Sequence, residues 1–164
     1  MTTVKRTLDD LALVPWSGIK DCAGSASAIP ALLTTVARGE EPAATSALAQ
    51  LRDRVCRYGF VVDQATAPTV PFLWDLVQLP HLGCRARVLR LLTDIVHAHQ
   101  WETTAATYPK LLHYPEDYVG WERAAREAVH AGRAVLDALL ADPGTATDPD
   151  LARAATDLAS TLSE

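Results

Sequence analysis

The amino-acid sequence predicts an all-α protein, an α-α superhelix of about three antiparallel helix pairs. Three observations lead to this prediction. A pattern recurs after 41 positions, from Pro30 to Pro71, apolar residues follow helical spacing within each copy, and neither strand alternation nor a hairpin dipeptide with matching flanks occurs. With 49% hydrophobic and 21% charged residues, the chain has the composition of a globular protein. Residues 1–164 are therefore expected to form a single domain.

The first copy is expected at about residues 26–58 and begins with a short amphipathic helix. Ile29 and Val36 lie on its apolar face, and Gly39 follows as a stop, because glycine adopts the left-handed conformation of helix ends without strain. A partner helix is expected from about residue 42 to residue 58. The copy thus has the pattern helix, turn, helix.

The second copy, at about residues 67–99, has the same register. Trp74 and Val77 belong to the apolar stripe of its first helix, and Leu92 and Ile95 to that of its second. Since one shift relates both helices, the two copies are predicted to share one structure.

An irregular insertion is expected between the second and third pairs, at residues 100–120. The apolar pattern lapses there, and the segment holds two prolines and three tyrosines. This composition favours a loop or a short helix over a regular repeat.

The third pair is expected over residues 121–162. One long helix should run from about residue 121 to residue 141, where the Asp-Pro-Gly sequence breaks it. Either Asp148 or Asp150 could cap the last helix, because a carboxylate there accepts the free amide protons of the first turn. Three pairs are about the minimum for a stable stack.

The chain resembles the HEAT-like repeat proteins of many high-GC actinobacteria. Trp16 and the segments 66–73 and 126–142 carry the resemblance, which covers roughly residues 14–100 and 121–162. It implies a HEAT-like superhelix and a binding scaffold, including immunity or accessory proteins for a neighbouring gene product. The motifs are specific for architecture and not for activity.

The charge distribution disfavours nucleic acid as a partner. The net charge is −5, and residues 91–164 contain five bases against twelve acids, which would repel a phosphate backbone. No apolar run approaches the roughly 20 residues that span a bilayer, so no membrane association is expected. Three cysteines without a CxxC pair indicate a reducing, cytoplasmic location.

No catalytic, metal or cofactor motif stands out. His97 and His99 are two positions apart, so on a helix they point about 200° apart and cannot readily share one ion. Neither a GxSxG nucleophile motif nor a glycine-rich phosphate loop is present. We expect no metal, no cofactor and no catalytic residue, with the cysteines on helical stretches and inert.

One polar stripe is the candidate binding surface. On the second helix of the second copy, charged and aromatic residues recur at spacings of three or four, and the second helices of HEAT stacks line a concave groove. The alternative is an ordinary solvated face with intrahelical ion pairs. With two arginines from the first copy, the predicted groove residues are Arg54, Arg57, Arg87, Arg90, Asp94, His97 and Trp101.

Two functional hypotheses follow. The first is a non-catalytic protein–protein interaction or scaffold module, because mixed charge with an aromatic suits a protein surface; a homo-oligomer is compatible with it. The second is a small enzyme or ligand-binding protein that uses the same groove. Its site would bind a small molecule or, by resemblance to HEAT-like DNA glycosylases, stabilise a cationic sugar with Trp101, Asp94 and Arg90. The short, acidic chain argues against the glycosylase.

Overall fold

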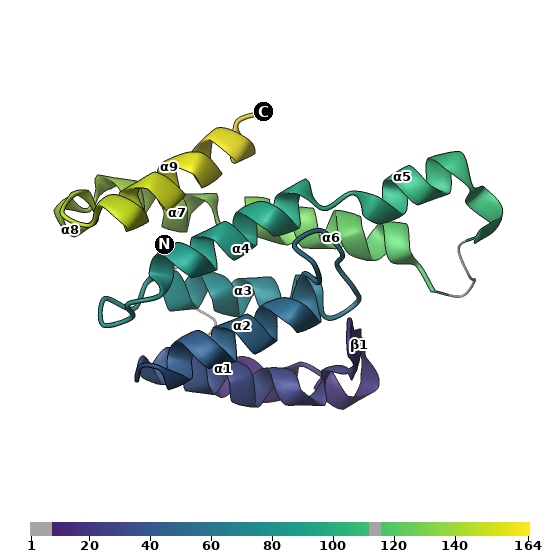
Figure 1. Ribbon diagram of the computed structural model, residues 1–164, viewed down its shortest axis with the longest axis horizontal. Coiled ribbons are helices and arrows are strands. Elements are labelled where there is room, and N and C mark those ends of the chain that lie inside the picture. The colour runs from purple at the N-terminus through teal and green to yellow at the C-terminus, as the bar shows by residue number, and fades with distance from the viewer. Residues whose placement is uncertain (1–7, 112–115) are drawn as a thin grey trace.

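The computed structural model describes residues 8–111 and 116–164, and this part of the chain is mostly helical (Figure 1). The fold class is all-α, as predicted. Before the first long helix the chain forms five short elements, which the sequence pattern did not indicate: η1 (Leu8–Leu13), η2 (Trp16–Gly18), β1 (Lys20–Asp21), β2 (Gly24–Ser25) and η3 (Ala26–Ala28). β1 and β2 pair as an antiparallel hairpin.

The N-terminal segment covers the outer side of the first helices. Trp16 is buried, its ring centroid lies 6.1 Å from that of Phe72, and its indole Nε1 donates a hydrogen bond to the Leu11 carbonyl at 2.8 Å. The ring therefore joins this segment to the core, and its polar atom is satisfied.

The first helix pair consists of α1 (Ile29–Arg38) and α2 (Ala43–Val55). Gly39 ends α1 with φ +71°, which confirms the predicted stop. A Cβ at this position would also lie 2.8 Å from Cδ2 of His81. The backbone conformation favours glycine here, and a larger residue would also have to displace the His81 ring.

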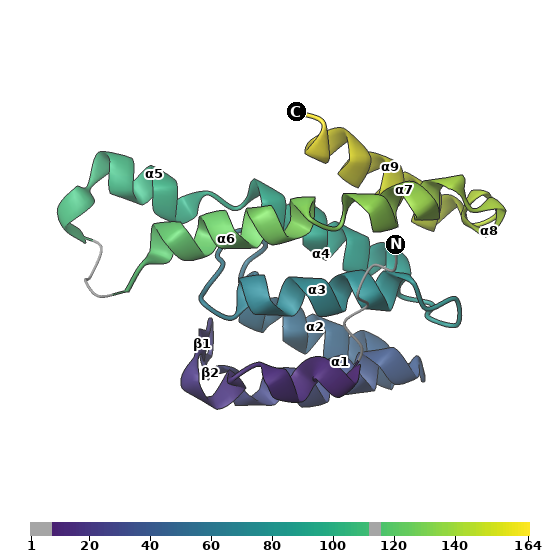
Figure 2. The same cartoon turned by 180° about the vertical axis from the view of Figure 1, so that it is seen from behind.

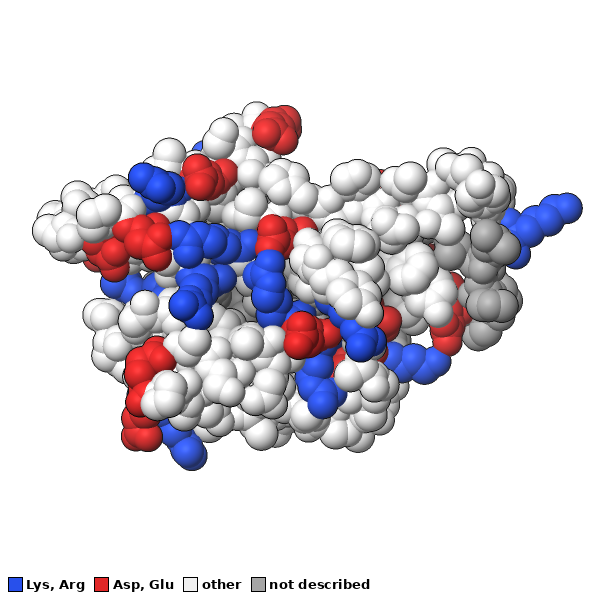
Figure 3. All heavy atoms as spheres, viewed as in Figure 1, with Lys and Arg blue, Asp and Glu red and all other residues white. Residues whose placement is uncertain are grey.

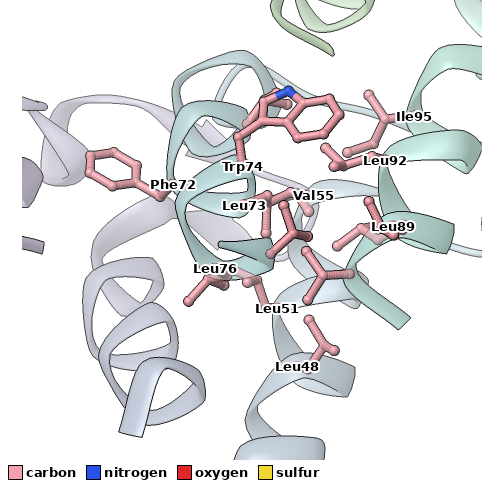
Figure 4. Close-up of a cluster of buried hydrophobic side chains, with 14 of the residues drawn as sticks. Leu48, Leu51, Val55, Phe72, Leu73, Trp74, Leu76, Leu89, Leu92 and Ile95 are labelled. Carbon is pink, nitrogen blue, oxygen red and sulfur yellow. The ribbon is translucent and has the colours of Figure 1, made fainter. Parts of the chain in front are cut away.

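The second pair consists of α3 (Thr66–Val77) and α4 (Arg85–His97). Figure 4 shows that α3 is central: Leu73 points toward the apolar faces of α2 and α4, whereas Phe72 points away from them. The predicted apolar residues Trp74, Val77, Leu92 and Ile95 are all buried.

The rest of the chain departs from the predicted third pair. The insertion contains a helix, and further helices follow it: α5 (Gln100–Thr107), η4 (Pro109–Leu111), α6 (Tyr118–His130), α7 (Arg133–Ala141), α8 (Pro143–Ala146) and α9 (Pro149–Leu162). Asp148 caps α9, since its Oδ1 accepts the Leu151 amide at 3.2 Å. Of the two proposed caps, Asp148 is confirmed.

The expectation of one long helix over residues 121–141 was wrong. The helix breaks at Ala131 and Gly132, between α6 and α7. The indole of Trp74 lies against this break, because a Cβ at position 132 would lie 2.1 Å from it. The backbone approaches the five-membered ring of the indole closely, and only glycine leaves room for it.

The long helices form two layers. In Figure 1, α2, α4 and α9 lie toward the viewer, and in Figure 2 the view from behind shows α3, α6 and α7 in front. α4 packs against α9, and α3 packs against α6. The helices α2, α4 and α9 therefore share one face, and all three run in the same direction along it.

Candidate functional site

A groove lies between α2, α4 and α9 and has a volume of about 420 Å³. Each of the three helices contributes to its wall, so the packing that forms the two layers also forms the groove. It is lined by Thr45, Leu48, Ala49, Arg52, Arg87, Arg90, Leu91, Thr93, Asp94, Ala154 and Asp157.

The base of the groove is apolar. Leu48 of α2, Leu91 of α4 and Ala154 of α9 line it, and each is buried beneath the rim. Because these three side chains are already buried, an occupant would gain mainly by burying its own apolar surface against them, at roughly 25 cal/mol per Å².

Two ion pairs connect the helices across the rim. Arg52 of α2 pairs with Asp94 of α4, and Arg90 of α4 pairs with Asp150 of α9. The side chains of the second pair are 47% and 64% exposed. These exposed charges are accessible to a partner. Because ion pairs in contact with water contribute only about 0–1 kcal/mol, they stabilise the fold little.

Two further charges on the rim have no hydrogen-bond or ion-pair partner among the residues that the structure describes. Arg87 and Asp157 are exposed, and in the described part of the chain neither makes a hydrogen bond or an ion pair. Figure 3 shows basic side chains gathered across the middle of this face, with acidic ones between and beside them. The groove thus offers an unpaired charge of each sign.

The structure brings only part of the predicted stripe together. Arg87, Arg90 and Asp94 line the groove, whereas His97 and Trp101 are not among the described residues that do so. For Trp101 the reason is the backbone: α4 ends at His97, and Ala98 has φ −70° and ψ +116°. The helical register on which the stripe depended is lost before Trp101.

Trp101 lies instead at the junction of α5 and α6. Its Nε1 donates to the Val62 carbonyl at 2.9 Å, and its ring stacks on Tyr118 with centroids 4.4 Å apart. Its backbone amide donates to the buried Glu122 carboxylate. This indole is used in packing, and the arrangement does not place it beside Arg90 and Asp94.

Arg54 and Arg57 hold the N-terminal hairpin. Nη1 of Arg54 lies 2.9 Å from Oδ2 of Asp21, a carboxylate buried in the structure. Nη1 of Arg57 donates to the Cys22 carbonyl at 2.9 Å. Neither arginine is among the described residues that line the groove.

The sequence reasoning missed the side of α2 that faces α4. Thr45, Leu48, Ala49 and Arg52 line the groove at positions i, i+3, i+4 and i+7. The lining residues of α4 from Arg87 to Asp94 repeat this spacing. The spacing on α2 therefore indicated one common helical face. The prediction instead selected the charged residues on the neighbouring face of the same helix.

The cysteines are not on helical stretches as expected; Cys22 lies in the hairpin turn, and Cys56 and Cys84 lie at helix ends. Burial raises the pKa of Cys56 to about 12 and that of Cys22 to about 11. Their thiols therefore stay protonated at neutral pH, which makes them poor nucleophiles.

Among the described residues no group of three or more His, Cys, Asp or Glu side chains is arranged to hold a metal. No helix in the same part of the chain is long and apolar enough to cross a bilayer. Comparison of the chain with protein-family models, with curated proteins and with solved structures found no match. The groove itself is the basis for a functional proposal.

Proposed function

We propose that the protein is a non-catalytic protein–protein interaction module that binds a segment of a partner protein between α2, α4 and α9. The observation that carries this proposal is the composition of the groove: an apolar base below a rim with unpaired charges at Arg87 and Asp157. Protein interfaces combine an apolar centre with a polar, charged rim in this way.

The charges on α9 argue against nucleic acid as the occupant. Asp157 lines the groove, and Asp150 pairs with Arg90 at its edge. A phosphate backbone laid along the arginines of α4 would meet both carboxylates. A peptide can place opposite charges along its length, and it therefore suits this rim better.

The size of the groove supports a second candidate, a ligand-binding protein. Its volume of about 420 Å³ lies within the range of roughly 300–1,000 Å³ that small-molecule sites occupy. A small anionic molecule with an apolar part would contact Arg87 above Leu91. Thermal-shift screening separates this candidate from the first.

The test is an affinity pull-down from native lysate with the groove filled by a side chain. Ala49 is an exposed groove residue, so Ala49→Trp should block the groove without disturbing the core. Ala124→Trp makes the same change on the exposed side of α6, in the other layer. Circular dichroism of both variants establishes that they are folded.

We expect a stoichiometric partner with the wild type and with Ala124→Trp, and its loss with Ala49→Trp. Equal retention by both variants would show that the partner binds elsewhere. If neither retains a protein but a small molecule raises the Tm of Ala124→Trp alone, the second candidate is the correct one.

A further inference from the structure

An aromatic turn adjoins the groove. The turn at residues 57–61 connects α2 to α3, and Tyr58 and Phe60 on it are 75% and 48% exposed. Their ring centroids lie 6.2 Å apart. Large exposed aromatic side chains that lie together are uncommon on a surface without a binding role.

The turn is held rigid. The backbone amide of Arg57 donates to the Val61 carbonyl at 2.7 Å, and the amide of Val61 donates back to Arg57 at 2.9 Å. The Arg57 guanidinium lies 5.4 Å from the centre of the Tyr58 ring. Little backbone freedom of the turn remains to be lost on binding, and this favours affinity.

Tyr58 adopts a backbone conformation that bulky residues rarely take. Its φ is +59°, in the left-handed region where asparagine and glycine are usual. Such a conformation costs of order 1–3 kcal/mol and persists only where the surroundings impose it. Here the strained residue carries an aromatic ring that faces solvent.

The turn lies at one end of the groove and Arg87 at the other. A Cβ on Gly59 would lie 3.8 Å from Nη2 of Arg52, which lines the groove. Arg52 pairs with Asp94, so the C-terminal halves of α2 and α4 adjoin. Since the two helices run in the same direction (Figure 1), Arg87 near the start of α4 lies at the far end.

We infer that the groove takes a short peptide segment that places an acidic side chain against Arg87 and an aromatic or aliphatic side chain against Tyr58 and Phe60. This inference rests on the proposed function and names the chemistry of the partner. The unpaired cation at one end supplies charge complementarity. The aromatic rings at the other supply an apolar anchor of the kind that dominates interface energies.

The experiment selects short random peptides displayed on phage with the full-length protein as bait. Parallel baits are Arg87→Glu, with Arg123→Glu on the other layer as a matched control, and the double variant Tyr58→Asn/Phe60→Ser. Asparagine is chosen because it tolerates positive φ. Fluorescence anisotropy with synthetic copies of the selected peptides then gives each Kd.

We expect the wild type to enrich peptides that combine Asp or Glu with Phe, Trp or Leu. Arg87→Glu should lose the acidic preference and the turn variant the apolar one, each with a Kd weakened about tenfold or more. Arg123→Glu should match the wild type.

Several results would overturn the inference. If all baits bound the peptides equally, neither Arg87 nor the aromatic turn would contact the peptide. If only Arg87→Glu lost binding, the turn would not be part of the site. Failure to select any peptide would reject a short segment, while the pull-down with Ala49→Trp still decides the proposed function. A dimer in light scattering that Ala49→Trp dissociates would identify a second copy as the occupant.

Discussion

The groove and the α5–α6 junction are made from similar residues and differ in what those residues contact. In the groove, the Arg52 and Asp94 side chains are 36% and 35% exposed. At the junction, Glu122 is fully buried, and its carboxylate accepts the backbone amides of Trp101 and Glu102 at 3.0 Å each. Charges that are buried and satisfied hold helices together, whereas charges at the rim remain available to a partner.

Glu122 replaces a missing helix cap. The N-cap residue of α5, His99, makes no capping hydrogen bond through its side chain. The two amides that Glu122 binds belong to the first turn of α5, whose amide protons have no partner within the helix. Arg126 adds a hydrogen bond to the Ala98 carbonyl at 3.1 Å and an ion pair with Glu102. α6 thus fixes the start of α5.

The largest effect is expected from Glu122→Ala. It leaves two amides without an acceptor, which costs about 1–3 kcal/mol for each amide that stays buried, and it takes from Arg126 one of its two carboxylate partners. Urea unfolding measures this loss. Glu127→Ala, on the exposed side of the same helix, should change stability by less than about 0.5 kcal/mol. If the two changes lowered the free energy of unfolding equally, the buried junction would be no more important for stability than the surface.

A smaller effect is expected from Trp101→Leu. The change leaves the Val62 carbonyl without the indole donor and removes the stacking on Tyr118, which together should cost about 2 kcal/mol. Thermal unfolding gives the value. Binding in the groove should be unchanged. A weaker Kd for the selected peptides would show that Trp101 belongs to the binding surface after all.

The sequence pattern predicted those features that depend on the residues of a single helix. The apolar spacing located α1 to α4 because each helix buries a face that is regular along its own length. Arg87, Arg90 and Asp94 lie on α4 alone, so their spacing sufficed to place them together. Trp101 was misplaced because the helix ends near Ala98, where neither glycine nor proline marks the break.

Remote contacts determined what the sequence pattern did not show. The need for glycine at position 132 comes from Trp74, which is far away in the chain. The start of α5 depends on Glu122, which follows it by some twenty residues. Neither partner can be identified from spacing within a helix, because the contact exists only after the layers have packed.

Arg90→Ala should have little effect on stability. Its ion pair with Asp150 lies in contact with water, so its loss should cost no more than about 1 kcal/mol. Comparison of urea midpoints at low and high salt checks this, because salt should reduce the small difference further. A loss near that of Glu122→Ala would mean that the rim is part of the structural core.

The smallest effect should come from Asp63→Asn and should depend on pH. Burial raises the pKa of Asp63 above its ordinary value of 3.8, and Glu116 and Asp21 add to the effect. A raised pKa in the folded state means that stability is full below the unfolded pKa and is lost as pH rises through the folded one. The variant should therefore gain stability over the wild type near neutral pH and lose that gain by about pH 3. A gain that is the same at both pH values would exclude this titration as its cause.

Trp74 lies where it can serve as an intrinsic fluorescence probe of the contact between the layers. Its indole is buried over Gly132, and Nε1 has no acceptor among the described residues, whereas the indoles of Trp16 and Trp101 both donate to carbonyls. A buried indole without a hydrogen bond emits at shorter wavelength than one in water. If α6 and α7 separated from α3, the contribution of Trp74 to the emission of the four tryptophans would shift to the red while the far-ultraviolet signal of the helices remained. Partial opening between the layers can thus be followed without a label.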